Sequence, residues 1–372
     1  MPAADILIIG GGVAGLSVGA ALSPHAKVTI LEAEEQIGFH SSGRSAALLH
    51  YALGNPPVRR LTMASRSFFE NPPARQETLL SSPLPILTPA RADELPGLQA
   101  LADDVSPFTE IDWLDADGLR RECPVLRIGP GDAEHGFIDR TALKLDGHGL
   151  LQVFSHQLRA SGGEIHEDTR IAAIDRGGSV WRVHSERGEV FEAPIVINAG
   201  GAWADAIARL ASVRPVGLQP MRRTIIVFDA PAGVHVDRLP FTKTVADEVY
   251  FGPEAGRIFA SPMDEVATDP CDAQPEEYEM ALAAHRIEER TVMKVGRIAH
   301  RWAGLRTFAP DRLPVVGFAT DVDGFFWLAG QGGAGLQTSP AVAAIASSLI
   351  AGSPWPVPDV SPDELSPARF FG

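Results

Sequence analysis

Short apolar runs and one helical period alternate over the first part of the chain. Residues 5–9 predict a buried strand, and Val28–Leu31 predicts a second one. Between them the apolar positions predict a helix over Val13–Leu22, which ends at Ser23-Pro24. A strand, a helix and a strand in such a short stretch predict a βαβ unit with two parallel strands.

Glycines occupy the turn between the first predicted strand and the helix. Gly10, Gly12 and Gly15 fill the positions of the pattern G-x-G-x-x-G, and Glu32 follows the second predicted strand. In dinucleotide-binding units the glycines allow a tight turn, close approach of a pyrophosphate and close helix packing, while the acid accepts from ribose hydroxyls. An ordinary βαβ unit would share the glycines, but not the whole ordered series. The pattern therefore predicts a dinucleotide site at the helix N-terminus.

The remaining pattern indicates an α/β fold in which one domain is assembled from separated stretches. Helices are expected over residues 57–70, ending at Asn71-Pro-Pro73, and over 141–160. The apolar run 194–198 predicts a return to the first sheet. We expect residues 1–82, 141–213 and 301–372 to form the nucleotide domain, and residues 83–140 and 214–300 to form a second domain on a mixed sheet.

Composition narrows the class of protein. The 372 residues are 45% hydrophobic and 21% charged, with a net charge of −15. An acidic surface repels the phosphate backbone of nucleic acids. We therefore expect no nucleic-acid partner. The two cysteines, Cys123 and Cys271, form no framework or metal site, and we expect a reducing, cytoplasmic compartment with both as small buried hydrophobes. No apolar run is long enough to span a bilayer; loose attachment to a membrane surface stays open.

Three further segments carry glycines or arginines in a strand-and-turn setting. Residues 196–203 (Val-Ile-Asn-Ala-Gly-Gly-Ala-Trp) predict a strand, a turn and a helix start, and residues 330–338 repeat that arrangement. Between them lie Trp302-Ala-Gly-Leu-Arg306 and Pro314-Val-Val-Gly317. Glycine turns of this kind present backbone N–H groups to a ligand.

Taken together, these segments resemble the D-amino acid oxidase superfamily of FAD-dependent oxidoreductases over essentially the whole chain. Four segments look most like its D-arginine dehydrogenase-like members: residues 39–46, 68–73, 217–223 and 304–308. The resemblance implies FAD as the cofactor and a substrate-binding cap domain over the flavin. The residues that it places at the cofactor are Gly10, Gly12, Val13, Ala14, Gly15, Glu32, Ser41, Ser42, Arg44, Ser45, Ala46, Ile171, Gly200, Trp203, Gly330, Gly332, Gly333, Gly335, Gln337 and Thr338.

The resemblance also implies a substrate site. Arg223 and Arg306 would grip the substrate carboxylate, because two guanidiniums give it bidentate, charge-assisted hydrogen bonds. Tyr250 would place its hydroxyl over the substrate, although a half-buried strand aromatic fits the sequence nearly as well. Gln337 would bind substrate or flavin, or else cap a helix. His50 would accept the amine proton, or else be a solvated or core histidine.

Other positions bear on the side-chain pocket and on the flavin link. Arg222 and Gly333 are assigned to the substrate pocket, although a surface ion pair suits Arg222 better. His40 stands where some relatives attach flavin covalently, but no covalent link is expected here. Leu48 and Leu53 replace a histidine and a tyrosine of the D-arginine dehydrogenase pattern, and Ile86 replaces its acid. With Ile86 at that position a guanidinium would lose its partner, so a neutral or apolar substrate side chain is expected.

The expected reaction is oxidative deamination of a D-amino acid. Hydride leaves the α-carbon for flavin N5, and the imino acid hydrolyses to a 2-keto acid and ammonia. Three alternatives stay open: oxidation of a secondary amine of the glycine or sarcosine type, oxidation of a 2-hydroxy acid, and a flavin-bearing subunit without chemistry of its own. The electron acceptor (a quinone, a carrier or O2) and the oligomeric state also stay open.

Overall fold

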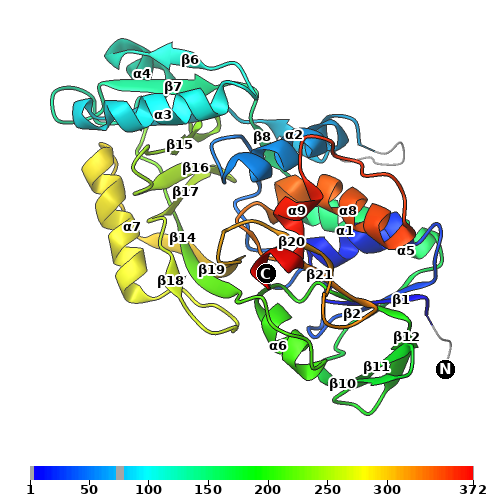
Figure 1. Ribbon diagram of the computed structural model, residues 1–372. Helices are drawn as coiled ribbons and strands as arrows, with labels where there is room; N and C mark the ends of the chain where they lie inside the picture. Colours follow the sequence, from blue (N-terminus) through cyan, green and yellow to red (C-terminus); the bar gives the residue numbers. More distant parts are fainter. Residues whose placement is uncertain (1–3, 73–78, 372) are drawn as a thin grey trace.

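The computed structural model describes residues 4–72 and 79–371, and it has two parts that meet side by side (Figure 1). One part is built on a six-stranded sheet and the other on a ten-stranded sheet. The six-stranded sheet has the order β20 (Val315–Phe318), β21 (Phe325–Ala329), β13 (Ile195–Asn198), β1 (Ile6–Ile9), β2 (Val28–Leu31) and β9 (Glu164–His166).

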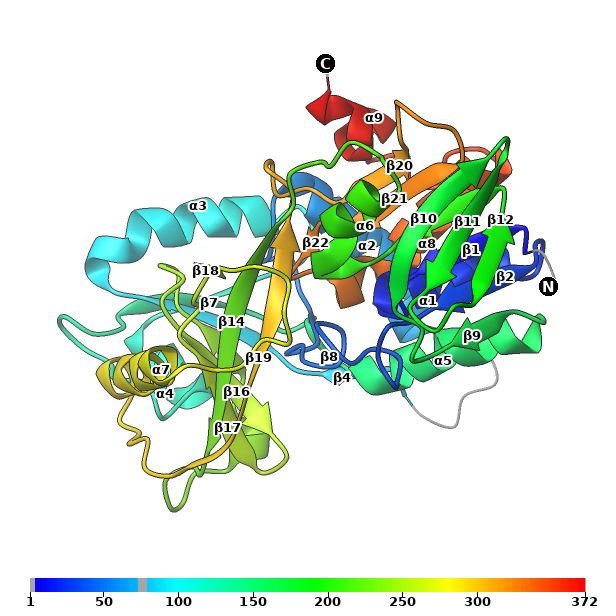
Figure 2. The ribbon, with the colours of Figure 1, turned by 90° about the horizontal axis from the view of Figure 1, so that it is seen from below.

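Parallel pairing joins most of this first sheet, with β1 at its centre between β13 and β2. All four residues of β1 are buried, as expected for a parallel strand that is covered on both faces. Ile6 and Ile8 pack with the helices on one face, whereas Leu7 and Ile9 pack with residues of β10, β11 and α6 on the other. Three helices supply the first face: α1 (Val13–Leu22), α5 (Gly147–Ala160) and α8 (Gly335–Ala351). Figure 2 shows the second layer, formed by β10 (Ile171–Gly177), β11 (Val180–Ser185), β12 (Val190–Ala193) and α6 (Ala204–Leu210).

The ten-stranded sheet is mixed, since β15 pairs with β5 in parallel and with β16 antiparallel. Its longest pairing joins β14 and β19 antiparallel. Helix α7 (Glu277–Arg290) packs on β14. The strands follow the order β22 (Gln331–Gly332), β19 (Ile298–Phe308), β14 (Gln219–Phe228), β17 (Arg257–Ser261), β16 (Tyr250–Glu254), β15 (Phe241–Lys243), β5 (Ile86–Ala90), β7 (His135–Asp139) and β6 (Asp112–Leu114), with β18 (Val266–Ala267) beside β14.

A small sheet, β3-β8-β4, corrects one prediction. The stretch 141–160 is not one helix: Leu143–Leu145 forms β8, which pairs with β3 (Leu48–Leu49) and β4 (Ser81–Pro83), and α5 begins only at Gly147. Asp146 caps the helix, because its side chain accepts from the backbone N–H of Gly149 at 2.8 Å. Tertiary strand pairing therefore overrides the helical period of the first residues.

Other predictions have mixed outcomes. Helix α2 (Pro56–Glu70) matches the expected 57–70, but Pro73 lies outside the described residues. Cys123 is buried, whereas Cys271 is exposed, so the expectation of a buried Cys271 is wrong. The expected domain boundary at 300/301 falls inside strand β19. The remaining helices of the described ranges are α3 (Leu95–Val105), α4 (Ala116–Glu122) and α9 (Pro362–Leu365), with short 3-10 turns at Ala92–Glu94, Gly201–Trp203, Val236–Arg238 and Pro367–Phe370.

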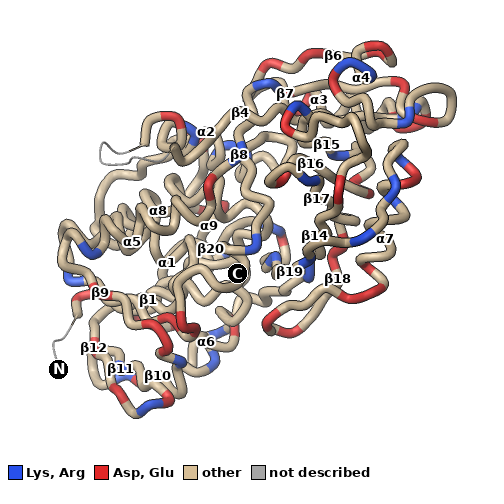
Figure 3. Tube along the Cα trace, turned by 180° about the vertical axis from the view of Figure 1, so that it is seen from behind, with Lys and Arg blue, Asp and Glu red and all other residues tan. Residues whose placement is uncertain are grey.

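Charge is distributed over the surface of both parts rather than gathered in one patch. Figure 3 shows acidic and basic positions interspersed along the outer helices and loops, while α1 and α8 are free of charged residues. Such helices are buried elements. Within residues 4–72 and 79–371, no helix combines the length and the apolar character that crossing a bilayer requires.

Candidate functional site

Two neighbouring cavities share part of their lining: one lies within the part built on the six-stranded sheet, and the other lies between the two parts. The Glu32 cavity, of about 220 Å³, lies over the ends of β1 and β2, and the Arg306 cavity, of about 190 Å³, lies against β14 and β19. The residues that line both are Gly12, Ser41, Ser42, Ala199 and Gly201. Because they share these residues, the two cavities together form one candidate site.

The glycine turn after β1 forms one end of this site. Gly10 has a φ of +111°, and a Cβ there would overlap the carbonyl group of Ala199. Gly15 lines neither cavity; a Cβ there would lie 2.0 Å from the carbonyl oxygen of Gly10, so its role is to let α1 pack against the turn. The first helical N–H, of Val13, donates to Oγ of Ser42 at 2.9 Å. The turn is therefore shaped for the close approach of a ligand to the N-terminus of α1.

Glu32 closes the same end of the site. Its Oε2 accepts from the N–H of Gly11 at 2.6 Å and its Oε1 accepts from the N–H of Glu34 at 2.9 Å. The carboxyl is buried, and burial raises its pKa above the ordinary value although these two hydrogen bonds oppose the shift. Each oxygen keeps a further lone pair for a hydroxyl donor.

The structure brings most of the residues expected at the cofactor to one or other cavity. His40, which also lines the Glu32 cavity, bonds Glu34 at 3.0 Å and lies 4.6 Å, centroid to centroid, from the Trp203 ring. Those at the Glu32 cavity are Gly10, Gly12, Glu32, Ser41, Ser42, Ile171, Gly200 and Trp203. Those at the Arg306 cavity are Gly12, Val13, Ala14, Ser41, Ser42, Arg44, Ser45, Ala46, Gly330, Gly332, Gly333, Gly335 and Gln337.

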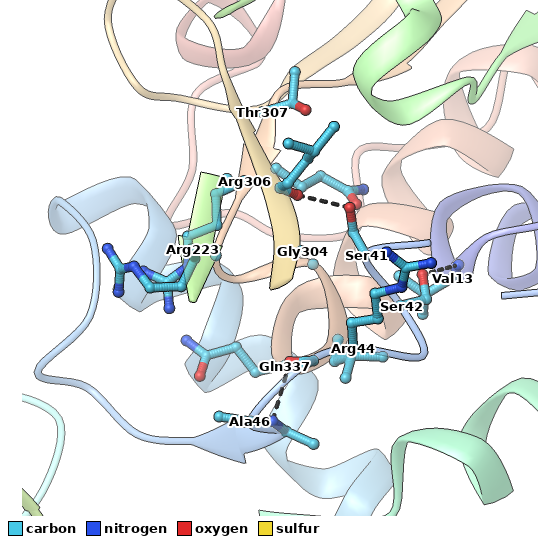
Figure 4. Close-up of a pocket in the computed structure, with 18 of the residues that line it drawn as sticks. Val13, Ser41, Ser42, Arg44, Ala46, Arg223, Gly304, Arg306, Thr307 and Gln337 are labelled. Atoms are coloured by element: carbon cyan, nitrogen blue, oxygen red, sulfur yellow. Dashed lines mark hydrogen bonds between the residues drawn. The ribbon is translucent and has the colours of Figure 1, made fainter. Parts of the chain in front are cut away.

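Two arginines enter the Arg306 cavity from neighbouring strands. Arg223 on β14 is registered with Gly304 on β19, and Arg306 follows Gly304 by two residues, so both arginines lie on one face of the sheet as diagonal neighbours. Figure 4 shows their side chains converging on one side of the cavity, opposite Ser41, Ser42 and Arg44. A Cβ at Gly304 would lie 3.4 Å from the Cβ of Arg44, so the glycine lets Arg44 pack closely on β19.

Both guanidiniums contact other parts of the protein, yet each keeps hydrogen-bond donors that have no acceptor among the described residues. Arg223 is buried; its Nε donates to the carbonyl of Asp264 at 2.6 Å and its Nη2 to Glu265 at 3.4 Å, while Nη1 finds no partner among the described residues. Arg306 packs against Gly333, where a Cβ would come within 3.0 Å of the guanidinium carbon. Burial, reinforced by the charge of Arg223, lowers the pKa of Arg306 to about 10. Unpaired buried donors of this kind favour an anionic ligand.

His50 and Gln337 form a connected pair rather than two separate substrate contacts. The Gln337 Oε1 accepts from the N–H of His50 at 3.3 Å, and its Nε2 donates to the carbonyl of His50 at 3.3 Å and to Oγ1 of Thr62 at 2.8 Å. Gln337 therefore positions the His50 backbone and also lines the Arg306 cavity, so its expected bond to substrate or flavin stays a prediction. Burial, with the charges of Lys243 and Arg306, lowers the pKa of His50 to about 3. The ring stays neutral near pH 7 and is a poor proton acceptor for an amine.

Three predicted positions lie elsewhere. Arg222 alternates with Arg223 on β14 and points to the opposite face, where it pairs with Glu276 and with Glu279 of α7. Ile86 on β5 is registered with Phe241 on β15; it is buried in an apolar cluster with Phe241 and Tyr250 and lines neither cavity. Thr338 lies inside α8, where its hydroxyl donates to the carbonyl of Ala334 at 2.9 Å. The assignments of Arg222 and Ile86 to the substrate pocket, and of Thr338 to the cofactor, are corrected accordingly.

Sequence reasoning missed the wall formed by β15. Phe241 and Lys243 both line the Arg306 cavity, next to Tyr250 of β16, whose hydroxyl has no partner among the described residues. The three-residue strand Phe241–Lys243 is too short for a recognisable period, although alternation within it would have placed both side chains on one face. Leu48, Leu53 and His50 line the cavity as predicted.

Comparison with known proteins places the chain in a family. Residues 5–349 match the family model described as "FAD dependent oxidoreductase" (DAO). The chain is 26% identical to the tRNA 5-methylaminomethyl-2-thiouridine biosynthesis bifunctional protein MnmC of Burkholderia multivorans, over 98% of this chain and 59% of the relative. It spans about three fifths of the length of the curated relatives it matches first.

Solved structures share the fold at low identity. L-alpha-glycerophosphate oxidase from Mycoplasma pneumoniae, with FAD bound, has a TM-score of 0.84 at 18% identity, covering 94% of this chain and 95% of that one. Glycine oxidase from Geobacillus kaustophilus has a TM-score of 0.81 at 20% identity, covering 97% and 98%. These likenesses confirm the expected α/β fold, whereas the expected closeness to D-arginine dehydrogenase stays a prediction. The match over nearly the whole chain shows that this protein belongs to the DAO family of FAD-dependent oxidoreductases.

Proposed function

We propose that this protein oxidises an amino acid at the carbon that carries the amine, next to a carboxylate, with FAD as cofactor. The finer proposal is oxidative deamination of a D-amino acid to a 2-keto acid and ammonia. The observation that carries the proposal is the pair Arg223–Arg306, which presents unpaired donors to a cavity that is continuous with the glycine turn. The D configuration rests on the family resemblance.

The site fits FAD by its shape and its donors. The Gly10 turn and the α1 N-terminus would receive the pyrophosphate, and Glu32 would accept from the ribose. Ile171 and Trp203 line the adenosine end, and the glycines from Gly330 to Gly335 line the end next to Arg306. When bound, FAD supplies a two-electron acceptor that takes hydride from carbon. His40 lines the Glu32 cavity and not the Arg306 cavity, which supports a non-covalent link.

The arginine pair would fix the substrate by its carboxylate. Nη1 of Arg223 and the guanidinium of Arg306, which has no ion-pair partner among residues 4–72 and 79–371, provide the donors for a bidentate grip. Such a grip leaves one rotation free, about the bond from the carboxylate to the α-carbon. Contact with the walls of the cavity removes that freedom and orients the α-carbon hydrogen.

The same residues set the protonation of the amine. An amine must be neutral before its carbon can release hydride, and nearby positive charge lowers an amine pKa. Arg223, Arg306 and Lys243 all line the cavity, and no Asp or Glu in the part of the chain that the structure describes does so. Tyr250 has a buried, unpartnered hydroxyl at this wall, which can accept from or donate to the substrate. His50 can contribute a hydrogen bond as a neutral ring, but the base that takes the amine proton is then solvent.

An anaerobic reduction experiment tests the proposal. The holoprotein is mixed without O2 with a panel of D-amino acids, L-amino acids, N-methyl glycines and 2-hydroxy acids, and flavin bleaching is followed. We expect D-amino acids to bleach the flavin and release ammonia. If only one of the other classes (L-amino acids, N-methyl glycines or 2-hydroxy acids) bleaches the flavin, that class is the substrate in place of D-amino acids. If no compound bleaches the flavin, the catalytic proposal is overturned. Readmission of O2, with peroxide measured, then separates an oxidase from a dehydrogenase.

A further inference from the structure

We propose that the amino acid oxidised carries a second anionic group, in the manner of a side-chain carboxylate, and that Lys243 binds it. The inference rests on the proposed function and names the substrate class of the same site. It replaces the neutral or apolar preference that was drawn from Ile86, which lines neither cavity.

Strand alternation brings Lys243 into the cavity. Phe241 and Lys243 are the first and third residues of β15 and both line the cavity, while Thr242 between them points away, with its hydroxyl 3.7 Å from the Cys123 sulfur. Lys243 is registered with Tyr250 on β16. The two side chains therefore stand side by side on the face of the ten-stranded sheet that also carries the arginine pair.

The charge of Lys243 is only weakly compensated. The residue is 8% exposed, and its ammonium pairs with Asp247, a carboxylate that is 62% exposed and lines neither cavity. An ion pair with so exposed a partner contributes little to stability, whereas a buried ammonium is costly to keep. A methionine would fill the same space without that cost. A cation retained at this position suits an anionic guest.

The other charged residues that line the cavity are positive as well. Its charged lining consists of Arg44, Arg223, Arg306 and Lys243, without a carboxylate. Arg44 is satisfied within the protein by Asp272 and by the carbonyls of Ala273 and Ala303. The arginine pair takes the α-carboxylate, which leaves Lys243 as the cation for a second one.

The lining also predicts what the site rejects. A substrate with a cationic side chain would meet the ammonium of Lys243 and find no carboxylate on the wall. A neutral amide of the same shape would lose the charge-assisted hydrogen bond but would suffer no repulsion. The order of preference expected is therefore acidic, then neutral amide, then basic.

The experiment compares matched substrates on the holoprotein by anaerobic stopped-flow. D-Glutamate is paired with D-glutamine, D-aspartate with D-asparagine, and D-lysine serves as the cationic member. In wild type, flavin reduction by the acid should exceed that by its amide by about 10- to 100-fold in kcat/KM, the range for one charge-assisted hydrogen bond. Lys243→Met should abolish that ratio, and Lys243→Arg should keep most of it.

Two controls isolate the role of Lys243. Asp247→Asn removes the exposed partner and should keep the acid preference, and Lys294→Met removes a lysine whose side chain is 73% exposed and should not change the ratio. Flavin content and circular dichroism show whether Lys243→Met folds. Equal or better reduction by the amides in wild type would overturn the inference and leave the proposed function standing. Failure of every amino acid to bleach the flavin would overturn both.

Discussion

Replacing Arg306 by methionine separates binding from stability, and Arg222→Met is its matched control. Both residues are arginines on adjacent strands of one sheet, yet they lie on opposite faces. Arg306 faces the cavity, whereas Arg222 pairs with two glutamates under α7. We expect Arg306→Met to lose activity without losing stability, and Arg222→Met to do the reverse.

The magnitude for Arg306 follows from its burial. Desolvation lowers the pKa of Arg306 to about 10, and at ~1.4 kcal/mol per pH unit the charged form costs on the order of 3 kcal/mol in the substrate-free protein. Because a base with a lowered folded-state pKa carries this cost at every pH below that pKa, the whole cost is present at pH 7. Arg306→Met should therefore keep or raise the free energy of unfolding, by up to about 3 kcal/mol. Losing the charge-assisted grip costs ~1.5–3 kcal/mol, or roughly 10- to 150-fold in kcat/KM.

For Arg222→Met the expected effect is a loss of stability, which comes from a broken ion pair. Its loss leaves the carboxylate of Glu279, which is 7% exposed, without a partner. Breaking one side of a buried ion pair typically lowers the free energy of unfolding by ~3–5 kcal/mol. Since Arg222 does not line the cavity, kcat/KM should stay near wild type.

Denaturant unfolding and steady-state kinetics on both variants measure the two effects. Flavin content is checked first, so that kinetics are compared per bound FAD. A large loss of kcat/KM in Arg222→Met together with a small one in Arg306→Met would refute the assignment of the carboxylate grip to Arg306.

Three further outcomes follow from single residues. Glu32→Ala should weaken FAD binding by about 10- to 100-fold, through the lost ribose hydrogen bonds, as measured by reconstitution of the apoprotein; unchanged affinity would contradict the role of Glu32. Because the pKa of His50 is lowered to about 3, stability should fall as pH drops from about 6.5 towards 3, by up to ~1.4 kcal/mol per pH unit, and His50→Asn should flatten this limb of the unfolding curve. A thiol reagent should modify Cys271 in the native protein and Cys123 only after unfolding, since burial also raises the pKa of Cys123 to about 11; two rapid native thiols would show that the Cys123 region opens.

The nucleotide end of the site was largely predictable because its signals are local. Gly10, Gly12 and Glu32 lie within one βαβ unit, where glycine spacing and the apolar runs specify the turn and the acid. The substrate end depends on pairing between distant strands. The diagonal placement of Arg223 and Arg306 follows from the β14–β19 register, to which the sequence offers no local guide.

The errors have the same cause. Ile86 and Lys243 lie on neighbouring strands, β5 and β15, and only the strand order shows that β15 forms the cavity wall. Gln337 lines the Arg306 cavity as expected, but its hydrogen bonds to the backbone of His50 and to Thr62 join segments remote in sequence and had no local signal. Short strands and polar side chains that bond distant backbone carry little signal in a single sequence.

The carboxylate grip is tested most directly by changing the substrate rather than the protein. Anaerobic flavin reduction is measured with a reactive amino acid and with its α-carboxamide, which keeps the amine, the α-carbon and the side chain but lacks the negative charge. Rapid bleaching by the acid and a loss of at least about tenfold with the carboxamide is the expected result, since each guanidinium loses a charge-assisted hydrogen bond. Equal bleaching by the two compounds would contradict it.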